Sequence, residues 1–215
     1  TLSSLSHYLA TVDATGVQIH QFANANLDLI VHDQSAKLTI ATNYPWDGTI
    51  VVTVQESPTE PWQLALRLPR WCTQYAVTLN GRAIVPTLGE NGYLLLERSW
   101  QPGDVLRLEL HMEPLFLAPH PRIDAVRGCA ALQRGPLLYC FESQDQPEGV
   151  ELQDVQVVTK AALVDTAVPL FTNMQLIQVP GQMTRAAWGN ALYRPLADLP
   201  STEKTAVMLT AIPYF

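Results

Sequence analysis

Apolar and polar residues alternate with a period of two from residue 17 to residue 112. The alternating segments have the length of strands, and turn-forming pairs such as Asp47-Gly48 and Asn80-Gly81 separate them. Such alternation gives a strand one apolar and one polar face, as half-buried antiparallel strands require. Short strands at regular spacing therefore predict a β-sandwich. The alternating apolar positions include Val17, Ile19, Leu27, Leu29, Val31, Leu38, Ile40, Ile50, Val52, Val54, Leu64, Leu66, Leu68, Val77, Leu79, Leu106, Leu108, Leu110 and Met112.

The first segment has a helical period instead. Leu2, Leu5, Leu9 and Val12 fall on one face of a 3.6-residue period, and Gly16 can end a helix in the left-handed conformation. A one-sided helix of about 12 residues is marginal by itself and must bury its apolar stripe against a partner. We therefore expect residues 2–13 to be the only long helix and residues 1–16 to be the end of an upstream helical domain.

The prolines indicate where one β domain ends and the next begins. The chain has 16 prolines and 11 glycines, which disfavours long helices and suits short strands with rigid turns. Pro114, Pro119 and Pro121 bracket a segment typical of a stiff link between domains. We predict that residues 1–25 are the tail of the helical domain, 26–115 a middle β-sandwich and 116–215 a C-terminal β-sandwich.

Charge and hydropathy exclude two classes of partner. Thirteen basic and 20 acidic residues give a net charge of −7 and a pI near 5.1. This balance lacks the cationic surface that a nucleic-acid backbone demands. The apolar runs are shorter than the roughly 20 residues that cross a bilayer. We expect neither a nucleic acid nor a membrane as a partner.

The three cysteines, Cys72, Cys129 and Cys140, are too few for a disulfide scaffold and too scattered for a zinc site. We interpret Cys72 as a small buried residue, with a nucleophilic role as the alternative. Cys129 and Cys140 would lie opposite each other in a tight hairpin, but Pro136 has no N–H to close that turn. The odd number favours reduced thiols in a cytoplasmic setting.

Five tryptophans are the remaining candidates for a binding site, because the sequence contains no metal, nucleophile or phosphate motif. Exposed indole rings on a sandwich can stack on sugar rings. Trp46 in a predicted turn is the first candidate for substrate binding, and Trp62 is a weaker one. The alternative is that the indoles fill the core and the sheet ends.

Several short motifs occur in an order that resembles one known family. The series resembles glycoside hydrolase family 127, the β-L-arabinofuranosidase-like enzymes, over nearly the whole chain. The opening, from Leu5 to Gly16, is similar to that family's last barrel helix and the strand after it. The motifs are Tyr44-Pro45-Trp46-Asp47-Gly48, Leu66-Arg67-Leu68-Pro69-Arg70-Trp71, Asn80-Gly81, Gly92-Tyr93, Arg98-Ser99-Trp100 with Pro102-Gly103-Asp104, Ala131-Leu132-Gln133-Arg134-Gly135-Pro136-Leu137-Leu138-Tyr139 and Ile212-Pro213-Tyr214.

The resemblance implies a three-part parent with an (α/α)6 barrel, a middle β-sandwich and a C-terminal β-sandwich. In the family, a cysteine thiolate held on zinc by further cysteines and a glutamate is the nucleophile. A carboxylic acid protonates the leaving group, and the configuration is retained. The nucleophile lies in a Cys-Cys-Pro sequence that does not occur here. No catalytic or metal role therefore transfers to this chain, and zinc is implied only in the parent's barrel.

The resulting hypothesis is an accessory β-sandwich part of a retaining glycosidase that releases L-arabinofuranose from glycans, inactive by itself. Its implied partners are the upstream catalytic barrel and the parent's glycan, with a homodimer as a further option. One alternative is a non-catalytic carbohydrate-binding module in which Trp46 and Trp62 stack on a glycan. Another is a structural sandwich that docks the barrel or forms a dimer.

Overall fold

The computed structural model describes residues 8–167, 174–186, 191–199 and 201–214. They divide into unit 1, Thr1–Met112, and unit 2, Glu113–Phe215, each with a hydrophobic core of its own. The described residues form strands and short 3-10 helices, and they contain no α-helix. None of these short helices is long and apolar enough to cross a membrane. The predicted fold class, mainly β, is confirmed.

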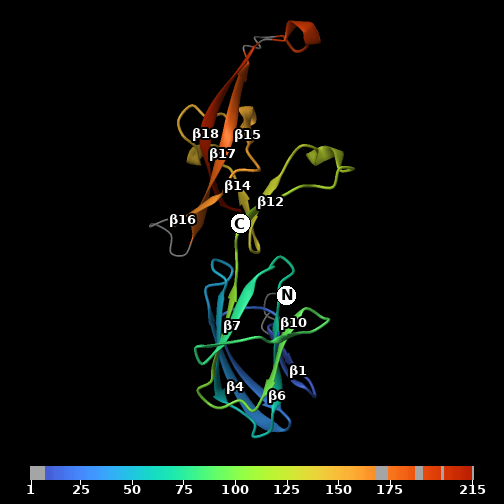
Figure 1. The fold of residues 1–215 in the computed structure, drawn as a ribbon, viewed down its shortest axis with the longest axis vertical. Coiled ribbons are helices and arrows are strands. Elements are labelled where there is room, and N and C mark those ends of the chain that lie inside the picture. Colours follow the sequence, from blue (N-terminus) through green and yellow to red (C-terminus); the bar gives the residue numbers. More distant parts are fainter. Residues whose placement is uncertain (1–7, 168–173, 187–190, 200, 215) are drawn as a thin grey trace. The chain divides into compact units, whose positions relative to one another are not determined.

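Unit 1 is a sandwich of two sheets, which Figure 1 shows edge-on with β4 and β7 in one layer and β1, β6 and β10 in the other. The five-stranded sheet has the order β1 (Ala10–Val12), β2 (Gly16–Ile19), β6 (Trp62–Arg67), β10 (Tyr93–Arg98), β9 (Thr87–Leu88). The six-stranded sheet has the order β3 (Ala25–Val31), β4 (Gln34–Thr42), β5 (Thr49–Glu56), β11 (Val105–Leu110), β7 (Tyr75–Leu79), β8 (Arg82–Ile84).

The core of unit 1 consists of the alternating apolar residues that face inward from both sheets. Leu64 and Leu66 on one sheet and Ile50 and Val52 on the other have no exposed surface. Trp100 lies 5.8 Å from the ring of Trp62, and its indole Nε1 donates to the Trp62 carbonyl oxygen at 3.1 Å. The two indoles therefore fill the interior, as the alternative interpretation of the tryptophans expected.

The expected N-terminal helix is wrong for the part that the structure describes, and residues 2–7 lie outside the described residues. Ala10–Val12 is strand β1, which pairs with β2 through the register Ala10↔Ile19. The turn between them is closed by the Asp13 carboxylate, which accepts the Thr15 backbone N–H at 2.7 Å and the Thr15 hydroxyl at 2.6 Å. Residues 13–16 therefore make a hairpin turn rather than a helix end, and Gly16 with φ +147° belongs to that turn.

The segment expected to be the tail of a helical domain is instead part of unit 1. Strand β2 runs parallel to β6, whereas only antiparallel pairing was expected. Val17 and Ile19 on β2 have no exposed surface and belong to the sandwich core. The predicted boundary at residues 25 and 26 is therefore wrong. Two parallel strands need a long connection between them. Between β2 and β6 the chain forms β3, β4 and β5 of the six-stranded sheet.

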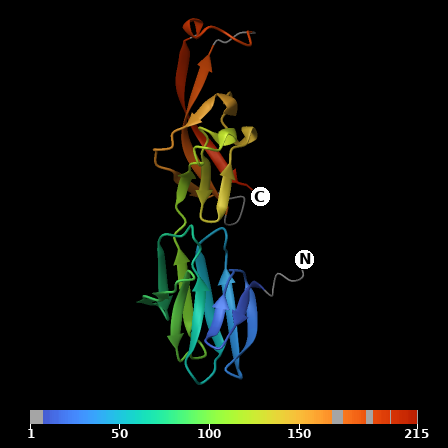
Figure 2. The same cartoon turned by 90° about the vertical axis from the view of Figure 1, so that its right-hand side faces the viewer.

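Unit 2 is built around one long hairpin. Strands β17 (Gln175–Ala186) and β18 (Thr202–Pro213) pair from Ile177↔Ala211 to Ala186↔Thr202, and both views show this hairpin in orange and red (Figure 2). Its buried residues pack with Leu132 and Tyr139 from neighbouring strands. The seven-stranded sheet has the order β12 (Pro114–Leu117), β13 (Ala131–Arg134), β14 (Leu137–Cys140), β18, β17, β15 (Val155–Val157), and β16 (Val164–Ala167) also pairs with β17.

The predicted inter-domain link is partly strand, so the division between units falls between residues 112 and 113 and not at 115 and 116. Pro114–Leu117 pairs with Ala131–Arg134. Gly135 and Pro136 then form a two-residue hairpin loop between Arg134 and Leu137, with Gly135 at φ +56°. Gly at the first central position suits a type II′ turn, in which the second central residue donates no N–H to the closing bond.

The register of this hairpin also shows whether Cys129 and Cys140 lie opposite each other. Leu132 pairs with Tyr139, so Cys140 does not lie opposite Cys129. Cys129 is exposed, Cys140 is half-buried, and both are free. The hairpin loop is Gly135-Pro136, one residue further along the chain than the Arg134-Gly135 loop that a pairing of these cysteines would need.

Asp104 joins two turns of unit 1 at one end of the sandwich. Its carboxylate accepts the Asn80 side-chain amide at 2.7 Å and the Gln101 backbone N–H at 3.0 Å, and Arg98 lies 3.6 Å away. Burial opposes the charge, but the Asn80 and Gln101 hydrogen bonds and the Arg98 charge together lower the pKa of Asp104. The carboxylate is thus built to remain ionised although its residue is only 6% exposed.

We expect Asp104→Asn to lower the free energy of unfolding of unit 1 by about 2–4 kcal/mol, because an amide NH2 cannot accept the N–H groups that face it. A carboxyl with a lowered folded pKa stabilises the fold above its unfolded pKa, and this stability is lost as the pH falls toward the folded pKa. Urea unfolding between pH 7 and pH 3, followed by tryptophan fluorescence, checks both effects. A variant that loses as much stability on acidification as the wild type would contradict this role.

We expect Gly48→Ala to destabilise unit 1 by about 3 kcal/mol, because the added Cβ would lie 1.9 Å from the Leu110 carbonyl oxygen. Gly48 also accepts the Leu110 N–H at 2.8 Å, so the two backbones cannot separate without losing that bond. Gly89→Ala is the matched control, since its Cβ would meet first the end of the Leu95 side chain at 3.1 Å. Thermal unfolding of both variants measures the difference, and equal losses would refute the steric explanation.

Candidate functional site

The outer face of the five-stranded sheet carries two pockets that meet at His20. On β6, Trp62, Leu64 and Leu66 point into the core, so the residues between them, Gln63 and Ala65, point outward. Ala65 is only 2% exposed although it points away from the core. The neighbouring side chains therefore rise above this face and leave it recessed.

His20 follows directly after β2 and is held on both ring nitrogens. Nδ1 lies 2.7 Å from the Tyr93 hydroxyl, and Nε2 lies 2.7 Å from the Thr11 hydroxyl. The rings of His20 and Tyr93 meet edge to face with centroids 5.7 Å apart. Burial, and secondarily the positive charge of Arg67, lower the pKa of His20. His20 is therefore a neutral, oriented imidazole at neutral pH.

The polar pocket lies on one side of His20 and has a volume of about 500 Å³. It is formed by the β1–β2 hairpin and the segment before β10, and its polar lining includes Thr11, Asp13, Thr15, Gln18, Glu90 and Asn91. The hydrogen bond from the Thr15 hydroxyl is the main cause that lowers the pKa of Asp13. Asp13 thus uses its carboxylate to close its own turn rather than to serve as an acid in the pocket.

The arginine pocket lies on the other side of His20 and has a volume of about 590 Å³. Phe22 and Tyr44 meet edge to face with centroids 5.8 Å apart. Burial raises the pKa of Tyr44, and the neighbouring Trp71 side chain partly offsets that rise. No acidic residue is among its described lining residues, which are His20, Gln21, Phe22, Tyr44, Arg67, Pro69, Arg70 and Trp71.

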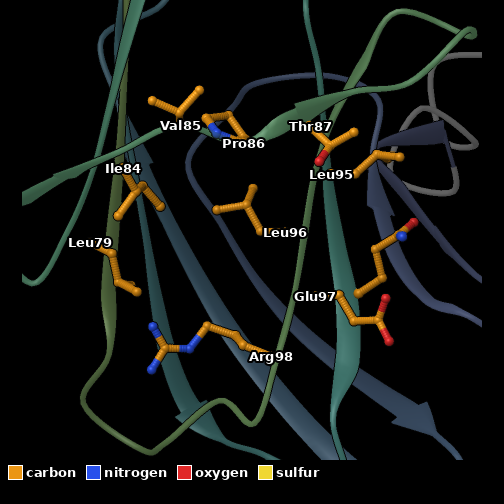
Figure 3. Close-up of a pocket in the computed structure, with 10 residues that line it drawn as sticks. Leu79, Ile84, Val85, Pro86, Thr87, Leu95, Leu96, Glu97 and Arg98 are labelled. Carbon is orange, nitrogen blue, oxygen red and sulfur yellow. The ribbon is translucent and has the colours of Figure 1, made fainter.

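An edge pocket of about 580 Å³ lies where the two sheets of unit 1 diverge. Figure 3 shows Leu96 and Ile84 facing each other across it, with the Arg98 side chain below them. The Val85-Pro86 connection crosses its upper side, and Val85 is 96% exposed. This pocket lies at a sheet edge, and its lining mixes apolar side chains with Gln63, Glu97 and Arg98.

The structure separates the two tryptophans expected to bind substrate. Trp62 is 1% exposed, and its Nε1 donates to the Ser57 hydroxyl at 3.0 Å, so the expectation that it stacks on a sugar is wrong. Trp46 lies half-buried in the turn after β4 and lines none of the three pockets described above. Its role in binding stays a prediction.

Four aromatic residues line the two pockets at His20, and none of them was selected from the sequence as a binding residue: Phe22, Tyr44, Trp71 and Tyr93. Trp71 follows the end of β6 within the segment Leu66–Trp71, next to Cys72. An Arg-x-x-Arg-Trp sequence directly after a strand was the available signal. Nothing in the sequence shows that the turn carrying Tyr44 lies beside it.

The described residues do not fit the zinc site that the family resemblance implies for the parent. They contain no group of three or more His, Cys, Asp or Glu side chains close enough to hold a metal. Cys72 is buried, its thiol lies 3.0 Å from the Gln74 carbonyl oxygen, and burial raises the pKa of its thiol. A raised pKa keeps the thiol protonated and a poor nucleophile. Among the residues that the structure describes, the pockets at His20 bring together no nucleophile with a base beside it.

Comparison with known proteins identifies the class. The model of the middle domain of glycoside hydrolase family 127, described as beta-L-arabinofuranosidase, matches residues 16–112. The model of the family's C-terminal domain matches residues 114–215. Together they cover unit 1 from β2 onward and nearly all of unit 2. The chain belongs to glycoside hydrolase family 127.

Individual relatives agree. The chain is 28% identical over 228 residues to the non-reducing end beta-L-arabinofuranosidase of Bifidobacterium longum subsp. longum, covering all of this chain and 33% of the relative. A beta-L-arabinofuranosidase of the same family from Geobacillus stearothermophilus T6 has 31% identity and a TM-score of 0.86, over 99% of this chain and 33% of that one. A structure described as a glycoside hydrolase has 27% identity and a TM-score of 0.84, over 99% and 35%. The chain thus spans about a third of the length of these relatives.

We expect His20 to titrate below the usual histidine pKa of about 6.5 and Arg67→Ala to raise that pKa part of the way back, because burial remains when the positive charge is removed. Since the folded pKa lies below the unfolded one, unit 1 loses this contribution to stability as the pH falls through that interval. NMR titration of the imidazole protons measures the pKa, and Arg82→Ala is the control of equal charge. An Arg67→Ala variant with an unchanged His20 pKa would refute the coupling.

Proposed function

We propose that this chain is the accessory β-sandwich part of a retaining glycoside hydrolase that releases L-arabinofuranose from glycans. The observation that carries the proposal is the match of the family's middle and C-terminal domain models, in that order, along a chain that spans about a third of its relatives. Both relatives named as beta-L-arabinofuranosidases support the reaction class.

The chemistry of the described residues agrees with an accessory role. Glycoside hydrolysis needs an acid and a nucleophile or base placed on either side of one sugar ring. Here Asp13, one of two carboxylates that line the polar pocket, accepts hydrogen bonds within its own turn, and burial raises the pKa of the Cys72 thiol. The zinc and the nucleophile of the parent are therefore proposed to lie in its catalytic barrel, outside this chain.

A second candidate function is a carbohydrate-binding module, and one observation favours it. One open pocket is lined both by the aromatic rings of Tyr44 and Trp71 and by the arginines Arg67 and Arg70. Aromatic rings with a few hydrogen-bonding groups are common in ligand sites. This candidate differs from the accessory role in requiring that the isolated chain binds a glycan.

We expect purified residues 1–215 to bind no stoichiometric zinc and to leave an aryl β-L-arabinofuranoside intact, because the residues needed to hold zinc and attack the sugar are not assembled here. Isothermal titration with zinc and release of the aryl group measure the two properties. The parent protein is the positive control and should hydrolyse the same substrate with retention. Turnover by residues 1–215 that disappears on mutating Cys72, Cys129 or Cys140 would overturn the proposal.

A further inference from the structure

The arginine pocket has an unbalanced charge in an acidic protein. Three of the six basic residues of unit 1 form ion pairs: Lys37 with Glu56, Arg98 with Asp104 and Arg107 with Glu109. Arg67 and Arg70 have no ion-pair partner among the described residues, and both line this pocket. Two guanidinium groups that line one pocket without an ion-pair partner among the described residues, in a chain with net charge −7, indicate a surface that binds carboxylates.

The pocket also carries the side chains that dominate protein–protein interfaces. Trp, Tyr and Arg are the residues most enriched among those that contribute most to binding free energy. Trp71 and Tyr44 pack against the outside of the unit 1 core and remain half-exposed. Their rings are therefore held in place before any partner arrives, which lowers the entropic cost of docking.

The balance of donors and acceptors favours a protein surface over a neutral sugar. Every sugar hydroxyl both donates and accepts a hydrogen bond, so a sugar site needs acceptors as well as donors. The described lining offers two guanidinium groups, which can only donate, and no carboxylate. A partner rich in carboxylates satisfies this set of donors better than a neutral saccharide does.

The sequence motifs point to a partner within the same protein. Tyr44 comes from one motif that carries the family resemblance, and Arg67, Arg70 and Trp71 come from another. The fold brings these motifs together at one pocket. The matching family model describes a middle domain, and the relatives are about three times as long as this chain. A partner in the same polypeptide would be present at an effective concentration of the order of millimolar.

We propose that the arginine pocket, through Arg67, Arg70, Tyr44 and Trp71, docks an acidic surface of the N-terminal portion of the parent glycosidase. This inference rests on the proposed function, because it requires that the parent has such a portion. Docking fixes the outer face of the five-stranded sheet against that portion. The arginines supply the pairing with carboxylates, and the aromatic rings supply the buried apolar contact.

Hydrogen exchange measured by mass spectrometry tests the contact in the wild-type protein. Peptides that cover residues 44–48 and 67–72 should exchange at least about tenfold more slowly in the parent than in isolated residues 1–215. The peptide around Arg82, another exposed arginine without an ion-pair partner among the described residues, should exchange equally in both. Equal exchange of all three peptides in the two proteins would overturn the proposal, as would a gene that encodes no N-terminal portion.

Charge reversal provides the matched variants. Arg70→Glu should leave the unfolding temperature of isolated residues 1–215 nearly unchanged, because Arg70 is exposed there. In the parent, Arg70→Glu should lower the unfolding temperature and cancel the slowed exchange of residues 67–72. Arg82→Glu, with the same change of charge outside the pocket, should do neither. Equal behaviour of the two variants in the parent would refute docking through this pocket.

If a saccharide or a second copy of the chain occupied the arginine pocket, the experiments would give different results. Saturable shifts of the Trp71 indole signal in residues 1–215, on titration with arabino-oligosaccharides or with galacturonate, would assign the pocket to a saccharide and overturn the proposal. A concentration-dependent dimer of residues 1–215 that Arg70→Glu dissociates would assign it to a second copy and also overturn it. A parent with slowed exchange but no arabinofuranosidase activity would refute the proposed function and leave the docking intact.

Discussion

Burial of alternate residues between the two sheets of unit 1 determines what its outer surface can present. Trp62, Leu64 and Leu66 must point inward to complete the core, and the pleat then forces Gln63, Ala65 and Arg67 outward. A shift of one residue in this register would exchange core and surface completely. Both pockets at His20 therefore depend on the same packing that stabilises the sandwich.

The outer face of the five-stranded sheet combines side chains held by local hydrogen bonds with arginines that form no ion pair among the described residues. Its histidine is neutral and held between two hydroxyl groups, and Asp13 is committed to its own turn. Its arginines, by contrast, have no ion-pair partner among the described residues. Under the proposed function, a family 127 chain that spans a third of its relatives would use such a face to contact another part of the same polypeptide.

The sequence predicted much of unit 1 because its strands are half-buried, and half-burial produces a clear period of two. The prediction failed at the N-terminal segment. There the spacing of Leu2, Leu5, Leu9 and Val12 fitted a helical period, but four positions are too few to exclude a strand. Asp13 and Thr15 close a hairpin turn there. Strand β2 pairs in parallel with β6, whose partner residues lie 47 positions further along the chain, as in Gly16↔Gln63. Such pairing lies beyond any local pattern. The division after Met112 was displaced for a related reason, since the proline-rich segment at Pro114 is a strand only because β13 pairs with it.

The sequence by itself determined the fold class, the membership of a glycosidase family and the absence of the family's Cys-Cys-Pro nucleophile motif, because these depend on local period and on residue identity. Only the tertiary structure decided which tryptophans are buried and which aromatic residues meet the arginines. Trp62 and Trp71 are nine positions apart, yet one lies in the core and the other lines the arginine pocket. The reason is physical: exposure depends on where a strand ends and on what the opposite sheet and the neighbouring turns place above it, and these neighbours come from distant parts of the chain.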